Sequence, residues 1–194
     1  MTLEMRRGEV EWALWALKTQ KKHPPPMPSE FGTRVRRLLE IDRGVDFVEA
    51  GAAPYAFSAD APGGKGFEAV FSLLDLMMLW LGLELVEMGF KQREVVDQLR
   101  FARPLLAKKL RSDLNGRPVG AAPLFLALPG IERSQHAWLR APRPFLIDAE
   151  DLAQRALDGK LAKLVILPVG WQALGFEQAL ELAPPVRRGR RPAP

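Results

Sequence analysis

The segment SLLDLMMLWLGLELVEMGFK, residues 72–91, decides the fold of this chain. Apolar side chains cover most of the circumference of the helix that it predicts, which is typical of a central, buried helix. Ser72, followed by Asp75 three residues later, predicts the helix start as a capping box with Asp in place of the usual Glu or Gln. Gly89 predicts the helix end, because glycine readily adopts the left-handed backbone conformation found at helix C-termini.

A second helix is expected directly after this glycine turn, over Lys91–Arg100. Leu85 lies four residues before Gly89, and Val95 lies six residues after it. This spacing is typical of a helix-turn-helix, in which apolar contacts fix the angle between two helices and the second helix enters the major groove of DNA. We therefore interpret residues 72–111 as a helix-turn-helix unit.

The positive charge of the chain is concentrated in two places. The formal net charge is +5; residues 91–111 carry seven Lys or Arg against two acidic residues, and the last eight residues carry four Arg and no acid. Clustered basic residues are typical of a polyanion partner, since each neutralised phosphate releases condensed counterions. The alternative is a solvated basic helix face together with a tail that keeps the chain soluble.

The basic segment supplies the candidate DNA contacts. Its cations are expected on phosphates: Lys91, Arg93, Arg100, Arg103, Lys108, Lys109 and Arg111. Arg and Gln read guanine and adenine edges in bidentate fashion, so the candidate base readers are Gln92, Arg93 and Gln98. Pro104 predicts a break in this helix or a fresh helix start, because proline is tolerated in a first helical turn.

The stretch GFEAVFSLLDL, residues 66–76, the apolar helix after it, and EMGFKQREV, residues 87–95, resemble the middle of the DNA-binding domain of the mercury-resistance-regulator (MerR) family. The resemblance covers about residues 62–100. It implies a winged helix-turn-helix, with Lys65 in a wing-like loop that touches phosphate. In that family the corresponding pair of helices supports the DNA-reading unit more than it reads bases.

Two further helices are expected before this unit. The first covers Leu3–Lys22 and ends at a run of three prolines. The second covers Glu30–Asp42 with Ser29 as its N-cap, and its outward side chains include Arg34, Arg36 and Arg37. The stretch Ala50–Gly66, rich in Gly, Ala, Pro and Ser, predicts a long mobile loop or a hairpin arm.

The turn signal at residues 115–118, Asn-Gly-Arg-Pro, is interpreted as a domain boundary. The fold class is therefore expected to be α+β and mainly α. A helical, winged helix-turn-helix domain would cover residues 1–114, a small α+β domain for dimerisation or sensing 115–183, and a basic disordered tail 184–194. The elements expected in the second domain are strands Pro123–Leu128, Phe145–Ile147 and Leu164–Leu167, and a helix Ala149–Leu157 capped by Asp148.

The composition argues against most catalytic chemistry. The absence of cysteine excludes disulfides and thiolate metal sites, and neither His23 nor His136 has a metal-ligating partner at a helical spacing. Asp148, Glu150 and Asp151 could form an acid–base cluster. They lie in the first turn of a predicted helix, however, where acids complement the helix dipole. We expect no metal, no cofactor and no enzymatic activity.

Neither a signal peptide nor a membrane span is expected. Met1–Glu11 carries five charges, and the longest apolar run, Leu76–Leu83, has eight residues, whereas a bilayer needs about twenty. The expected protein is cytoplasmic: a sequence-specific DNA-binding transcriptional regulator that binds double-stranded DNA as a homodimer, with its effector left open. The alternative is a protein–protein adaptor or dimeric scaffold whose basic helix meets an acidic partner.

Overall fold

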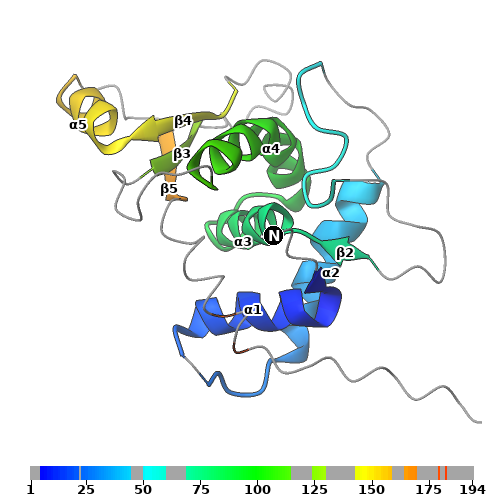
Figure 1. Cartoon of the computed structure of the whole chain (residues 1–194). Coiled ribbons are helices and arrows are strands. Elements are labelled where there is room, and N and C mark those ends of the chain that lie inside the picture. Colours follow the sequence, from blue (N-terminus) through cyan, green and yellow to red (C-terminus); the bar gives the residue numbers. More distant parts are fainter. Residues whose placement is uncertain are drawn as a thin grey trace, which may run out of the picture.

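The computed structural model describes residues 5–21, 23–44, 50–59, 69–114, 124–129, 143–158 and 164–169, together with residues 179 and 182. Helices dominate these residues and two small sheets accompany them (Figure 1), so the expected class, α+β and mainly α, is confirmed. Within the described part of the chain, no helix combines the length and the apolar character that crossing a membrane requires.

Helix α3 (Leu73–Glu87) is the centre of the helical part and lies between α1 and α4 in Figure 1. The predicted capping box is present: the Asp75 N–H donates to Ser72 Oγ at 3.2 Å, and the Ser72 N–H donates to the Asp75 carboxylate at 2.7 Å. Gly89 has a φ of +92°, as the predicted left-handed turn requires. Local sequence signals therefore set both ends of this helix.

Helix α4 (Gln92–Leu114) is continuous, so the predicted break at Pro104 is wrong. A proline inside a helix leaves the carbonyl four residues earlier without its usual helical N–H donor. Here that carbonyl belongs to Arg100, and the Ala53 N–H donates to it at 2.9 Å. A donor from another segment thus replaces the missing helical bond, and the helix continues past the proline.

Helices α1 (Arg7–Thr19) and α2 (Ser29–Arg43) complete the helical core, and α2 packs against both α3 and α4. Strand β1 (Met5–Arg6) precedes α1 and pairs antiparallel with β2 (Val70–Phe71), which leads into α3. This short ladder, absent from the sequence-based expectation, ties the two helix starts together. The predicted cap Ser29 is instead the first residue of α2, and no side-chain hydrogen bond caps this helix.

Residues 50–59, called the strap below, take a fixed path across the helices. Ala56 and Phe57 are completely buried. Their backbone N–H groups donate to the Asp42 carboxylate at 2.9 to 3.1 Å. The prediction of a mobile loop is therefore wrong for the strap, while residues 60–66 lie outside the described part of the chain.

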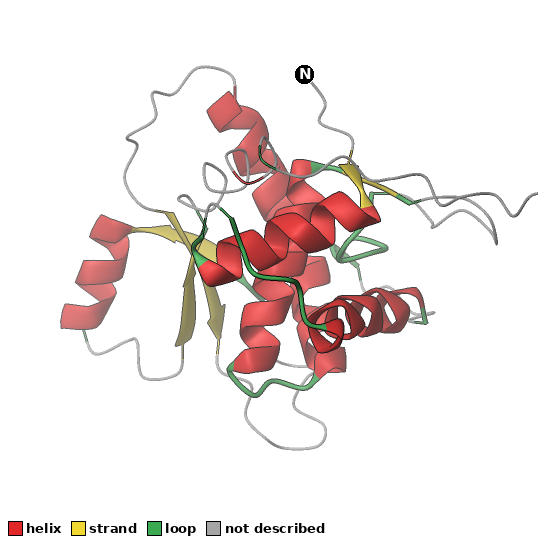
Figure 2. Ribbon diagram, turned by 90° about the horizontal axis from the view of Figure 1, so that it is seen from below, coloured by secondary structure: helices red, strands yellow, loops and turns green. Residues whose placement is uncertain are grey.

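The second sheet has the order β4-β3-β5 and is antiparallel throughout. Its strands agree with the predicted ones within two residues: β3 (Leu124–Pro129), β4 (Phe145–Asp148) and β5 (Leu164–Pro168). Helix α5 (Ala149–Leu157) has the predicted bounds, and its cap Asp148 accepts a hydrogen bond from the Asp151 N–H at 2.9 Å. Figure 2 shows this sheet and α5 to one side of the larger helices.

One face of the second sheet belongs to the same buried cluster as the helices. Leu126, Leu128 and Leu167 join the apolar core formed by α1 to α4. The core therefore continues across the predicted domain boundary. That boundary, at residues 115–118, and the tail over residues 184–194 lie outside the described residues.

Candidate nucleic-acid interface

Two of the predicted DNA contacts are buried. Arg100 is only 2% exposed; its Nε donates to Asp42 Oδ1 at 2.9 Å, and its Nη2 donates to the main-chain carbonyl of Asp42. The ring of Tyr55, from the strap, lies 5.9 Å from the Arg100 guanidinium. A guanidinium enclosed in this way cannot reach a phosphate, so the assignment of Arg100 to DNA is wrong.

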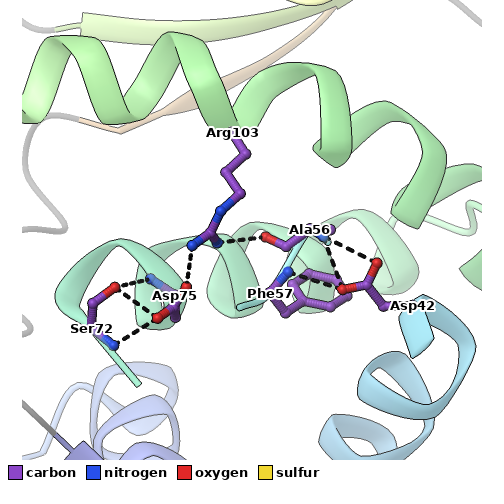
Figure 3. Close-up of polar contacts among 6 residues, drawn as sticks. All are labelled: Asp42, Ala56, Phe57, Ser72, Asp75 and Arg103. Carbon is purple, nitrogen blue, oxygen red and sulfur yellow. Dashed lines mark hydrogen bonds and ion pairs between the residues drawn. The ribbon is translucent and has the colours of Figure 1, made fainter. Parts of the chain in front are cut away.

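Arg103 is enclosed in the same manner (Figure 3). One of its Nη atoms donates to Asp75 Oδ1 at 2.5 Å, and the other donates to the Ala56 carbonyl at 3.0 Å. Asp75 is itself held by the backbone and hydroxyl of Ser72, both at 2.7 Å. The assignment of Arg103 to phosphate is therefore wrong too, and its role is to fasten the strap and the start of α3 to α4.

The buried ion pairs of Arg100 with Asp42 and of Arg103 with Asp75 reduce the positive charge that residues 91–111 expose. Asp42 and Asp75 belong to the slightly acidic N-terminal part of the sequence, whereas their partners belong to the basic segment. Part of the apparent segregation of charge is thus neutralised inside the protein. The number of basic residues in a segment overstates the cations that it exposes.

Other predicted contacts lie at the surface of α4. Lys91 has 84% of its side chain exposed, and the exposed Arg93 pairs with Asp97, with Nε 3.4 Å from Oδ1. Gln92 and Gln98 are half-buried, and Gln98 Oε1 is a buried atom without a hydrogen-bond partner within the described structure.

Towards the end of α4, Lys108 is exposed and Lys109 is half-buried. Arg111 also belongs to α4, but its side chain lies outside what the structure describes. Lys65, the candidate from the family resemblance, lies in a segment that is likewise outside the described residues. The structure thus leaves the roles proposed for Arg111 and Lys65 as predictions.

Helix α2 adds cations to which the sequence-based analysis gave no ligand. Its exposed arginines are Arg34, Arg36, Arg37 and Arg43. Arg34 pairs with Glu87 at the end of α3, with Nη1 3.6 Å from Oε1. Among the described residues, no carboxylate lies at ion-pair distance from the other three. The sequence predicts that Arg34, Arg36 and Arg37 point outward, but a basic residue on a surface helix is common, so this pattern gives no reason to assign them a ligand.

The arginines occupy both flanks of α2. Arg37 follows Arg34 by one helical turn and therefore shares the flank that faces the end of α3 and the start of α4. Arg36 follows Gly32 by one turn and shares the flank that faces α1, because a Cβ added to Gly32 would lie 3.6 Å from Glu11 Oε2. Arg43, two turns beyond Arg36, lies on that same flank.

Helix α2 runs beside α4, since Asp42 near its end meets Arg100 while Arg34 near its start meets Glu87, just before α4. Arg37 lies on the flank of α2 towards the end of α3, whereas Arg36 and Arg43 lie on the flank that faces α1. The exposed cations of the two helices are together called the cationic face below: Arg36, Arg37, Arg43, Lys91 and Arg93.

One acidic side chain of α4 is electrostatically unusual. Asp97 is half-buried, and this burial raises the pKa of its carboxyl above the ordinary value. The positive charges of Arg93 and Arg100 lower the pKa, but they do so less than burial raises it, and the nearby Asp42 carboxylate adds a smaller increase. Asp97 is thus an acid of weakened strength at the edge of the cationic face.

No protein-family model matches the chain, and no curated protein resembles it closely enough to count as a relative. Among the described residues, no group of three or more His, Cys, Asp or Glu side chains is arranged to hold a metal ion.

Proposed function

We propose that this protein is a DNA-binding transcriptional regulator that contacts duplex DNA through the cationic face. The observation that carries the proposal is the set of three exposed arginines on α2, Arg36, Arg37 and Arg43, for which the described residues provide no acidic partner. Arginine forms bidentate hydrogen bonds with phosphates and with guanine edges. A surface helix that carries several such side chains is a suitable element to lie against a nucleic-acid groove.

The helix pair α3 and α4 takes a supporting role in this proposal. Leu85 and Val95 are both buried, and the left-handed Gly89 forms the turn between the helices, which supports the interpretation as a helix-turn-helix. Arg100 and Arg103 of α4 are buried, however, and cannot reach DNA. Base reading is therefore better assigned to α2. This division of roles agrees with the resemblance to the MerR family, in which the corresponding pair supports the reading unit.

The start of α4 would then flank the reading helix. Lys91 and Arg93, both exposed, would contact the DNA backbone beside α2, and such contacts set the register without reading sequence. Lys65 and a wing remain part of the proposal through the family resemblance alone. A homodimer is expected as well, because a two-fold protein matches a pseudo-palindromic site, and sedimentation of the free protein tests it.

The proposal is tested by fluorescence anisotropy on labelled fragments of genomic DNA, titrated with salt. Arg36→Ala with Arg37→Ala is expected to weaken binding about tenfold or more and to lower the slope of log affinity against log salt by about two, one for each lost phosphate contact. Lys108→Ala with Lys109→Ala removes the same charge further along α4 and is expected to change affinity less.

Two results would contradict the proposal. If the wild-type protein binds no fragment at low salt, DNA is not its partner, and the adaptor function becomes the better interpretation. If replacement of Lys108 and Lys109 abolishes binding while replacement of Arg36 and Arg37 does not, the contact surface is the second half of α4. Circular dichroism of each variant verifies that the fold is retained.

A further inference from the structure

We propose that Asp97 regulates the cationic face as an internal competitor of DNA: its ionised carboxylate holds Arg93 and repels phosphate, and its protonation releases Arg93. The inference rests on the proposed function. It goes beyond it by assigning a pH-dependent affinity to one acidic side chain.

The first step is the contact between Asp97 and Arg93. The two residues are one helical turn apart on α4, with Arg93 Nε 3.4 Å from Asp97 Oδ1. The Arg93 side chain is 57% exposed and that of Asp97 is 32% exposed, so the pair lies at the surface. A phosphate that binds Arg93 must therefore replace this carboxylate or bind beside it.

The second step is the surroundings of Asp97. On its own helix it faces Arg93 and Arg100, and from α2 it faces Asp42. Arg100 is held in the core by the Asp42 side chain and main-chain carbonyl, so its position does not depend on the charge of Asp97. Arg93 is consequently the cation whose freedom depends on the charge of Asp97.

The third step is the ease of protonation. Because burial weakens Asp97 as an acid, it takes up a proton at a higher pH than an ordinary aspartate does. Bound DNA would favour the neutral carboxyl further, since phosphate oxygens near Arg93 repel a carboxylate. Binding of DNA and protonation of Asp97 are thermodynamically linked. If bound DNA favours the protonated carboxyl, then protonation of Asp97 increases the affinity for DNA by the same factor.

The experiment uses a 20-base-pair duplex of mixed sequence and the full chain, with affinity measured between pH 4 and pH 8 at constant salt. Asp97→Asn is expected to bind about three- to fivefold more tightly than wild type at pH 8, the effect of one surface charge pair. The two proteins are expected to converge as the pH falls. The ratio between them is the readout, because every other titratable group is the same in both proteins.

Glu94→Gln serves as the matched control. Glu94 is also an acid of α4, one turn before Gln98, and its carboxylate lies 3.9 Å from the Lys91 ammonium. The Glu94 variant removes the same unit of charge but leaves the contact between Asp97 and Arg93 in place, so it is expected to raise affinity at pH 8 less than Asp97→Asn does. A carbon NMR titration of the Asp97 carboxyl, with and without duplex, adds a direct measurement, and its midpoint is expected to rise when DNA is bound.

The outcomes separate the two proposals. A wild-type protein that binds the duplex, with an Asp97→Asn variant of equal affinity at every pH, overturns the role of Asp97 and leaves the proposed function intact. An Asp97 midpoint that does not rise on DNA binding overturns that role as well. If no protein binds the duplex at any pH, both the proposed function and this inference fail.

Discussion

Arg100 and Asp42 form a buried ion pair that joins α4 to α2 and holds the strap in place. The Asp42 carboxylate accepts hydrogen bonds from Arg100 Nε at 2.9 Å and from the backbone N–H groups of Ala56 and Phe57. Both charged side chains are 3% exposed. Three segments that are distant in the sequence thus meet at one carboxylate.

Replacement of Asp42 by alanine is expected to destabilise the protein by about 3–5 kcal/mol, because it leaves a buried guanidinium without its counter-charge. The two strap N–H groups would also lose their acceptor. Urea unfolding followed by circular dichroism measures the change in free energy. Glu40→Ala, which removes an exposed acid of the same helix, is the control and is expected to change stability by no more than about 0.5 kcal/mol. Equal effects of the two variants would contradict the role given to the pair.

Arg100 is unsuitable as a position at which to test DNA binding. Arg100→Ala removes the other partner of the pair and is expected to unfold the protein in part. A loss of DNA binding in that variant would therefore reflect the loss of folded protein and would not identify Arg100 as a DNA contact. Arg93→Ala, at an exposed position, keeps the core intact and tests the interface itself.

Gly82→Ala is expected to lower stability by about 1 kcal/mol, although alanine is the better helix former. A Cβ at this position of α3 would lie 3.1 Å from two ring atoms of Phe57 and 3.4 Å from Leu38 Cδ1. Overpacking of this kind costs about 1–3 kcal/mol, which exceeds the helix propensity gained.

A double-mutant cycle tests the cause of this loss. Phe57→Leu removes the ring that the new methyl group meets, so Gly82→Ala is expected to be less harmful in that background. Unfolding free energies of the four proteins give the coupling. Strict additivity of the two changes would show that the ring is not the obstacle.

The parts of the fold that were predictable depend on short-range signals. The capping box at Ser72, the turn at Gly89 and the cap at Asp148 act within one helical turn, and the structure has all three. The strands of the second sheet were predicted from runs of apolar residues that lie within each strand. Such features need no knowledge of the distant chain.

The errors arise where a distant residue decides the outcome. Pro104 remains inside a helix because Ala53 supplies a donor, and Arg100 is buried because Asp42, 58 residues earlier, receives it. The local sequence pattern around a basic residue of a predicted helix is the same whether its side chain faces water or a buried acid. Charge alone therefore does not separate an exposed candidate such as Lys91 from the buried Arg100 and Arg103.

The strap is expected to resist hydrogen exchange despite its loop-like composition. The N–H groups of Ala53, Ala56 and Phe57 donate to the Arg100 carbonyl and the Asp42 carboxylate, so their exchange requires the strap to open. Amide exchange followed by NMR measures this protection. Gly51 is exposed and provides the comparison within the same segment. Equally fast exchange at all four amides would contradict a fixed strap.

Asp97→Asn is expected to stabilise the protein at neutral pH. Since burial raises the pKa of Asp97 in the folded state, the folded chain binds this proton more tightly than the unfolded chain does. Its ionised form therefore costs stability above the folded-state pKa, and the cost disappears once the pH falls below the unfolded-state value. Thermal unfolding of the variant and wild type is expected to differ at pH 7 and to converge towards pH 4. A variant that is less stable at pH 7 would show that the pair with Arg93 outweighs the cost of burial.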